Sequence, residues 1–219
     1  MGTGWGMMSA SITSDYDLLG NFPEKLRALL QWVMWRYEDH GKPKPDKVLY
    51  NPRTGQRAKS NDPQTWGSSI EVVTVFHRGG FDGVGFVFSA ADPYTGIDLD
   101  SCRDPETGLL EPWAGEIVER LDSYTEASPS GRGVHILIKG TLPAGGRKKG
   151  KVAMYDTGRF FTVTGEHLGG TPTKIEERTA ELAALHAEVF GKRQENSQKH
   201  AHTENGAANG YTTRGLMKS

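Results

Sequence analysis

The spacing of apolar residues predicts four helices, because side chains three or four positions apart share one face of a helix. These helices are expected at residues 21–30, from 62 or 69 to about 80, at 112–121 and at 175–190. Asn21 is the expected cap of the first helix, with Pro23 in its first turn. The second begins either at the cap and proline of Asp62-Pro63 or at Ser69, and Gly191 ends the last.

Short runs of apolar, β-branched and aromatic residues predict strands between these helices. The expected strands cover residues 31–37, 47–50, 84–89, 97–100, 134–138 and 159–164. The turn-like residues 92–96 separate two of these runs, so 84–89 and 97–100 are expected to form a hairpin. Helices and strands together predict a mixed α+β fold.

The chain has 219 residues, which fits one domain and additional terminal segments. Residues 1–20 show no clear period, and we expect a disordered lead-in or a remnant of cloning there. The folded domain is expected to span 21–191. Residues 192–219 are polar and contain almost no apolar side chains, which predicts a disordered tail or a linker to a further module.

Composition excludes several classes of protein. Lys and Arg number 26 against 27 Asp and Glu, so the formal net charge of −1 excludes a globally basic nucleic-acid coat. Any nucleic-acid binding must come from a local patch. No apolar run reaches the length of about 18 residues that spans a membrane. Cys102 is the single cysteine, which excludes an internal disulfide and predicts a reducing cytoplasm.

Two acids on one predicted strand are the first candidate site. Asp98 and Asp100 flank Leu99, so both carboxylates point to the same side of the strand and repel each other. A divalent cation would relieve that repulsion, although two solvated acids at a strand end would give the same pattern. A calcium loop is excluded, because Arg103 stands where its glycine would be and Leu109 where its glutamate would be.

A glycine-rich turn before a strand is the second candidate. Ser130, Gly131, Arg132 and Gly133 are followed by His135, and such a turn offers backbone amides and a guanidinium to a phosphate. A simple turn followed by a structural histidine is the alternative.

Cations form the third group. Arg159 opens a predicted strand, where it is either near a ligand or exposed to water at an edge. The loop before it carries the densest positive charge of the chain, a candidate contact for a nucleic-acid backbone or simply a solvated loop. Its cations are Arg147, Lys148, Lys149 and Lys151.

Three segments in this order carry a resemblance to a known family: residues 96–100, 130–135 and 155–165. They resemble the three motifs of the archaeo-eukaryotic primase superfamily, and most of all the bifunctional primase-polymerase domains of phages and plasmids. The likeness covers about residues 26–170.

The resemblance implies a two-module core with an RNA-recognition-like sheet, a catalytic cleft between the modules, and template-directed nucleotidyl transfer. It implies Mg²⁺ or Mn²⁺ as cofactors, and single-stranded DNA template, primer and nucleoside triphosphates as partners. A helicase or primase-assisting module could follow the chain, which would act in the cytoplasm of a host cell.

The resemblance also assigns residue roles. Asp98, Asp100 and His135 match catalytic positions, and the two aspartates match the metal ligands. The implied nucleotide-binding residues are Ser130, Gly131, Arg132, Gly133, His135 and Arg159. The charge of the basic loop, and not the resemblance, makes Arg147, Lys148, Lys149 and Lys151 the candidate nucleic-acid contacts.

One departure from the family pattern concerns Ala153, where related domains usually carry an acid. The chain is then a weak or inactive polymerase, unless Asp156 replaces the missing acid. Two alternatives stay open: a non-catalytic nucleic-acid-binding module of polymerase descent, and a glycosyltransferase that uses Asp98 and Asp100 to hold a nucleotide diphosphate.

Overall fold

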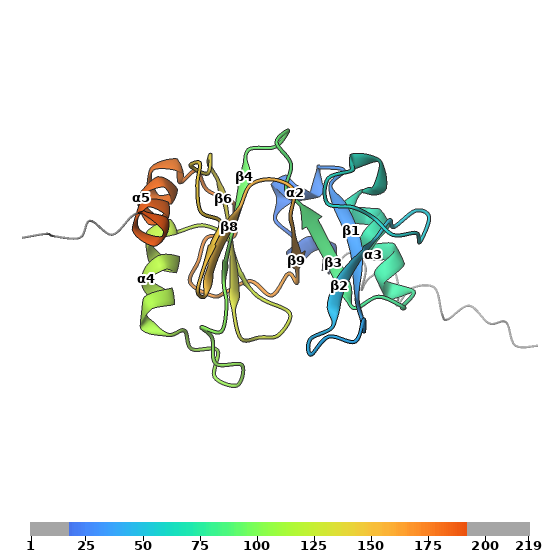
Figure 1. The fold of residues 1–219 in the computed structure, drawn as a ribbon, viewed down its shortest axis with the longest axis horizontal. Coiled ribbons are helices and arrows are strands. Elements are labelled where there is room, and N and C mark those ends of the chain that lie inside the picture. The colour runs from blue at the N-terminus through green and yellow to red at the C-terminus, as the bar shows by residue number, and fades with distance from the viewer. Residues whose placement is uncertain (1–17, 192–219) are drawn as a thin grey trace, which may run out of the picture.

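Two antiparallel sheets form the centre of the protein (Figure 1). The structure, a computed structural model, describes residues 18–191, so the expected 192–219 tail and nearly all of the lead-in lie outside the described residues. The first sheet has the order β2 (Asp46–Tyr50), β1 (Trp32–Glu38), β3 (Gly83–Val87), β9 (Phe160–Val163). The second has the order β5 (Thr125–Ala127), β6 (Val134–Lys139), β4 (Tyr94–Leu99), β8 (Val152–Tyr155), β7 (Lys148–Lys149). The mixed α+β prediction is confirmed.

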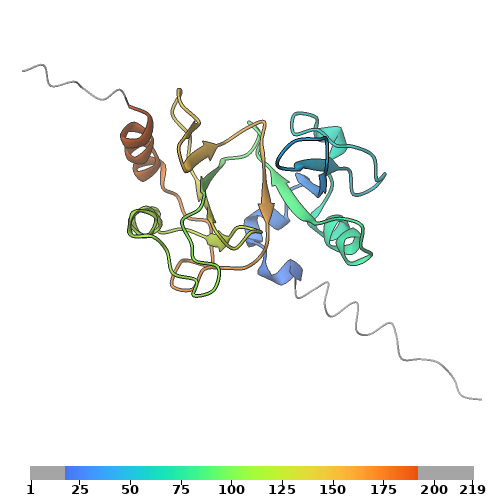
Figure 2. The same ribbon diagram turned by 60° about the horizontal axis from the view of Figure 1, so that its bottom comes forward.

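Helices cover one outer face of each sheet. The helices α4 (Pro112–Leu121) and α5 (Thr179–Phe190) lie on the second sheet, and α3 (Ser69–His77) lies at the far side of the first (Figures 1 and 2). Buried apolar side chains from β4, β6 and β8 share a core with α4 and α5. Because side chains alternate along a strand, the remaining residues of these strands face the first sheet.

The two sheets approach each other closely at Gly96 in β4. A Cβ atom on this glycine would lie 2.5 Å from the ring of Phe88 and 2.6 Å from the ring of Phe161. These rings meet edge to face, with centroids 5.1 Å apart. Only a residue without a side chain allows the backbone of β4 to lie against them.

The predicted hairpin between 84–89 and 97–100 is wrong. β3 pairs with β1 and β9, whereas β4 pairs with β6 and β8 in the other sheet. Asp92 fixes the crossing between the sheets, since its carboxylate accepts hydrogen bonds from the Gln31 side chain and from the backbone of Ser89 and Tyr94.

The first predicted helix is shorter than expected. Asn21 does not cap it: α2 (Glu24–Arg27) begins after Pro23, and Leu30 is 63% exposed beyond its end. The two possible starts of the second helix are both used, by a 3₁₀ turn (Pro63–Thr65) and by α3. The helix predicted at 112–121 is confirmed, and the last one begins at Thr179.

The longer predicted strands are confirmed to within a few residues. The short strands β5, β7 and β8 were not predicted, because two to four residues show no readable alternation. Within residues 18–191, no helix is long and apolar enough to cross a membrane.

Candidate active site

The register of the second sheet places five residues from five strands in one row. Glu126 lies opposite His135, His135 opposite Asp98, Asp98 opposite Ala153, and Ala153 opposite Lys148. Residues directly opposite in antiparallel strands have side chains on the same face. The neighbours of Asp98 in β4 belong to the core under α4 and α5. The row therefore faces the first sheet.

His135 is held between the two sheets. Its residue is 7% exposed, and its ring lies 4.9 Å from that of Phe161. Nδ1 is 3.0 Å from the carbonyl oxygen of Thr162. A carbonyl can only accept, so Nδ1 carries the proton in this contact. Nε2 is thereby directed towards Asp98, whose Oδ1 is 3.8 Å away.

Sequence reasoning missed Glu126, which lies behind His135. Its residue is 1% exposed, and its carboxylate accepts hydrogen bonds from the Tyr124 hydroxyl and from the backbone N–H groups of Thr164 and Gly165 at 3.0–3.1 Å. Burial and the adjacent carboxylate raise the pKa of Tyr124, so its hydroxyl stays protonated and can donate. Glu126 Oε1 is also 3.8 Å from His135 Nδ1.

Asp98 carries a partly buried carboxylate, with 33% of its side chain exposed. Burial raises its pKa and repulsion from Asp100 adds to the rise, while His135, Lys148 and Lys47 act in the opposite direction. Within the described chain, this carboxylate accepts no hydrogen bond. Asp100 follows the last residue of β4 and is exposed.

A cavity of about 400 Å³ opens in front of this row. Its size lies in the range of small-ligand sites. Three cations from distant segments line it together with Asp98 and His135: Lys47 from β2, Lys148 from β7 and Arg159 just before β9. Burial lowers the pKa of Lys47, whose ammonium lies 4.7 Å from the centre of the Trp35 ring. Lys47 was not identified from the sequence.

The glycine turn lies beside the acids, but its arginine points elsewhere. A Cβ atom on Gly133 would lie 2.6 Å from the carbonyl oxygen of Leu99, so a glycine is needed for the turn to reach β4. Arg132 lines a different cavity, with Ser101 and Arg103, and is not among the residues that line the cavity of Asp98. The expectation that Arg132 and His135 share one pocket is therefore not met.

The structure does not place Asp156 beside Asp98. The sheet register sets Ala153 beside Asp98, whereas Asp156 follows the end of β8 and lies 3.8 Å from Arg147. Asp156 does not line the cavity that contains Asp98.

The four cations of residues 147–151 do not form one surface. Lys148 lines the cavity, whereas Lys149 donates to the carbonyl of Val189 on the other side of the strand. Arg147 donates to the carbonyl of Pro143, and Lys151 to that of Ser101. Side chains alternate between the two faces of a strand, so neighbouring cations in the sequence point in different directions. The prediction of one patch from the sequence did not take this alternation into account.

Comparison with known proteins shows that the sequence is similar to that of a viral replication protein. The chain is 38% identical over 146 residues to the DNA primase-polymerase of Nitratiruptor phage NrS-1. The chain is related to a primase-polymerase. The matched region covers 64% of this chain, which spans about 20% of the length of the phage protein. No model of a known protein family matches the chain.

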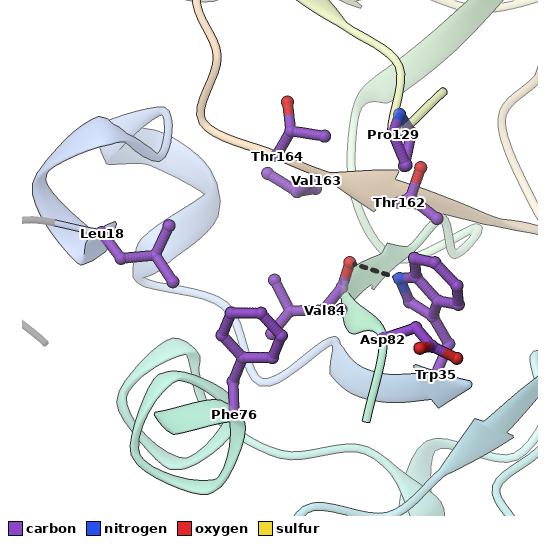
Figure 3. A pocket seen from close by; sticks show the side chains of 10 residues that line it. Leu18, Trp35, Phe76, Asp82, Val84, Pro129, Thr162, Val163 and Thr164 are labelled. Atoms are coloured by element: carbon purple, nitrogen blue, oxygen red, sulfur yellow. Dashed lines mark hydrogen bonds between the residues drawn. The ribbon is translucent and has the colours of Figure 1, made fainter. Parts of the chain in front are cut away.

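Beside β9 lies a smaller cavity of about 180 Å³ (Figure 3). Trp35, Phe76 and Val84 line it, and the Trp35 indole N–H donates to the carbonyl of Val84 at 3.1 Å. It is smaller than usual small-ligand sites, so the larger cavity is the better candidate for a ligand site. Thr162 lines both cavities.

A preformed metal centre is absent from the described part of the chain: no three His, Cys, Asp or Glu side chains come together as ligands there. Cys102 is buried, and burial raises the pKa of its thiol to about 11. This thiol therefore stays protonated at neutral pH in the metal-free protein.

Proposed function

We propose that the chain is a template-directed nucleotidyltransferase, a DNA primase or polymerase domain that acts in phage or plasmid replication. The observation that carries this proposal is the convergence of Asp98, His135 and Arg159, which are far apart in the sequence, on one cavity. The similarity to a phage primase-polymerase supports it. The proposed partners are single-stranded DNA template, primer and nucleoside triphosphates.

Mg²⁺ or Mn²⁺ is the proposed cofactor, held by Asp98 and Asp100. The residues fit such an ion, because Mg²⁺ in phosphate-transfer sites is commonly bound by one or two carboxylates and the phosphates of the substrate. The carboxylate of Asp98 accepts no hydrogen bond from residues 18–191, and its pKa is raised by burial. A cation would compensate both effects. When bound, it would stabilise negative charge on the attacking 3′-oxygen and on the leaving pyrophosphate.

The cations of the cavity have a role that does not depend on the metal. Lys47, Lys148 and Arg159 come from three separate segments, line the cavity and would bind the triphosphate. His135 would contact the same phosphates through Nε2, since Nδ1 is already used by the Thr162 carbonyl. The fixed ring orientation means that little rearrangement is needed when the substrate binds.

Ala153 limits this activity in our proposal. It lies opposite Asp98, where the Cβ atoms of a directly paired position are about 5 Å apart. A glutamate at this position would bring a third carboxylate to Asp98 and strengthen cation binding. Without it, a second function gains support: a module that binds nucleic acid and does not turn over triphosphates. A glycosyltransferase would leave the His135 and Arg159 placement without a purpose.

The test is extension of a labelled primer on a single-stranded DNA template with Mg²⁺ or Mn²⁺. We expect Ala153→Glu to extend the primer at least about 10-fold faster than the unchanged chain, because a lost ligand of a metal site typically costs this much or more. EDTA or a further Asp98→Asn substitution should abolish the product. Ala153→Gln is the matched control, since it has the shape of glutamate without its charge.

Two results would contradict the proposal. If Ala153→Gln were as active as Ala153→Glu, the added carboxylate would have no role. If neither the unchanged chain nor Ala153→Glu extended a primer while both bound DNA, the chain would be a binding module.

A further inference from the structure

A second cavity, of about 450 Å³, lies on the other side of the end of β4. Residues 101–111 form one wall and the glycine turn forms the other, through Arg132. Ser101 lines this cavity, and Asp98 lines the first. Three residues along an extended chain span about 10 Å, so the two cavities are neighbours.

The backbone fixes two arginines at this cavity. The N–H groups of Cys102 and Arg103 both donate to the carbonyl of Arg132, at 2.8 and 3.0 Å. The guanidinium of Arg103 donates to the carbonyl of Gly131 at 2.9 Å. These bonds tie the two walls together, and both arginines line the cavity between them.

Both arginines retain unused donors. Nε of Arg103 is buried and has no hydrogen-bond partner among the described residues. The Arg132 side chain forms no hydrogen bond or ion pair within residues 18–191. The free guanidinium of Arg132 is the kind of group that contacts phosphate in a bidentate manner, with Arg103 beside it in the same cavity.

The two acids that line the cavity, Asp104 and Glu111, already have other hydrogen-bond partners. The Asp104 carboxylate accepts hydrogen bonds from the backbone N–H groups of Thr107 and Glu106, and these bonds lower its pKa. The Glu111 carboxylate is bonded to the Trp113 indole and to Lys151, which lower its pKa as well. Attraction from Arg103 also lowers the pKa of Asp104, but within residues 18–191 neither acid forms an ion pair with Arg103 or Arg132. The Arg132 guanidinium therefore stays available to an anion.

We propose that this second cavity binds a phosphodiester of a nucleic-acid strand. Leu109 is 71% exposed at its rim and provides an apolar contact for a sugar or base. A strand whose end reaches Asp98 would pass within reach of Arg132. The choice of a nucleic acid as the ligand rests on the proposed function, while the phosphate chemistry rests on the cavity itself.

The test is fluorescence anisotropy of a labelled 20-nucleotide single strand with the full chain, without metal or nucleotide, at several salt concentrations. We expect Arg132→Gln to weaken binding about 3–10-fold and to reduce the slope of log K against log salt by about 0.7, the value for one lost phosphate contact on a single strand. Leu109→Glu should weaken binding too, and its exposure makes a folding defect improbable. Arg120→Gln is the matched control, because Arg120 pairs with Glu188 on the helical side of the molecule.

A parallel titration with a nucleoside triphosphate separates the two sources of phosphate. The proposal is overturned if Arg132→Gln and Leu109→Glu bind the strand as the unchanged chain does. It is also overturned if Arg132→Gln weakens triphosphate binding alone, which would make the cavity a nucleotide site. Absence of primer extension contradicts the proposed function but not this proposal, because the anisotropy needs no catalysis.

Discussion

At the scale of single residues, the candidate site contains carboxylates whose burial in the protein costs free energy. Glu126 is completely surrounded but accepts three hydrogen bonds, so its burial is compensated. Asp98 is partly buried without such bonds from residues 18–191. Burial without such bonds is unfavourable for the charged carboxylate and is expected to lower the stability of the fold.

Asp98→Asn is therefore expected to stabilise the protein at neutral pH while it abolishes any extension activity. The pKa of Asp98 is raised in the folded state, because the fold favours the protonated carboxyl group. The protonated group therefore stabilises the fold below the ordinary carboxyl pKa, and this stabilisation is lost as pH rises through the higher folded pKa. The urea midpoint of the variant, measured in EDTA, should exceed that of the unchanged chain at pH 7. The difference should disappear near pH 3.

The exposed Glu116 on α4 provides a control, since Glu116→Gln should change stability by less than about 0.5 kcal/mol. A lower midpoint for Asp98→Asn at pH 7 would show that the attraction from His135, Lys148 and Lys47 outweighs the cost of burial.

At the scale of elements, helix starts could be predicted from the sequence where the signal is local. Ser68 caps α3 and forms a capping box with Glu71, and Pro112 begins α4. Strand pairing could not be predicted in the same way. The hairpin prediction for 84–89 and 97–100 failed because each strand finds its partners from distant parts of the chain.

Glu71 joins α3 to the loop after β2, since its carboxylate also accepts from Arg53 at 2.7 Å. The bond from Arg53, followed by those from Ser68, lowers the pKa of Glu71 to about 2. A lowered pKa means that the ionised Glu71 stabilises the folded state. The stabilisation is fully present above the unfolded-state pKa of about 4.5 and is lost as pH falls through the folded-state pKa of about 2. We expect Glu71→Gln to cost about 0.5–1 kcal/mol at pH 7, a modest value because the side chain is 37% exposed.

Thermal unfolding at pH 7, 4 and 2.5 checks this expectation. Glutamine can keep the capping box, so the variant isolates the charge. The deficit of the variant should shrink between pH 4.5 and 2, and an equal deficit at every pH would assign the effect to packing.

At the scale of the whole molecule, the candidate site exists because two sheets meet. The sequence motifs identified Asp98, His135 and Arg159, which line one cavity. They could not identify Lys47 or Glu126, because these residues reach the site only through the arrangement of β2 and β5. The cavity that Arg132 lines could not be predicted for the same reason. Its motif predicts a phosphate contact, but the path of the turn in the fold decides which cavity the residue lines.

Gly96 gives the final prediction, since it sets the distance between the sheets. A methyl group there would overlap the rings of Phe88 and Phe161, both of which are buried and cannot move freely. Gly96→Ala should therefore lower the free energy of unfolding by about 1–3 kcal/mol, the usual cost of overpacking.

Gly115→Ala is the matched control, because nothing lies within 4 Å of its Cβ position in α4 and alanine there should stabilise by about 0.5–1 kcal/mol. Urea unfolding measures both changes. A Gly96→Ala variant as stable as the unchanged chain would mean that the sheets separate without cost, and the cavity between them would then not be a fixed site.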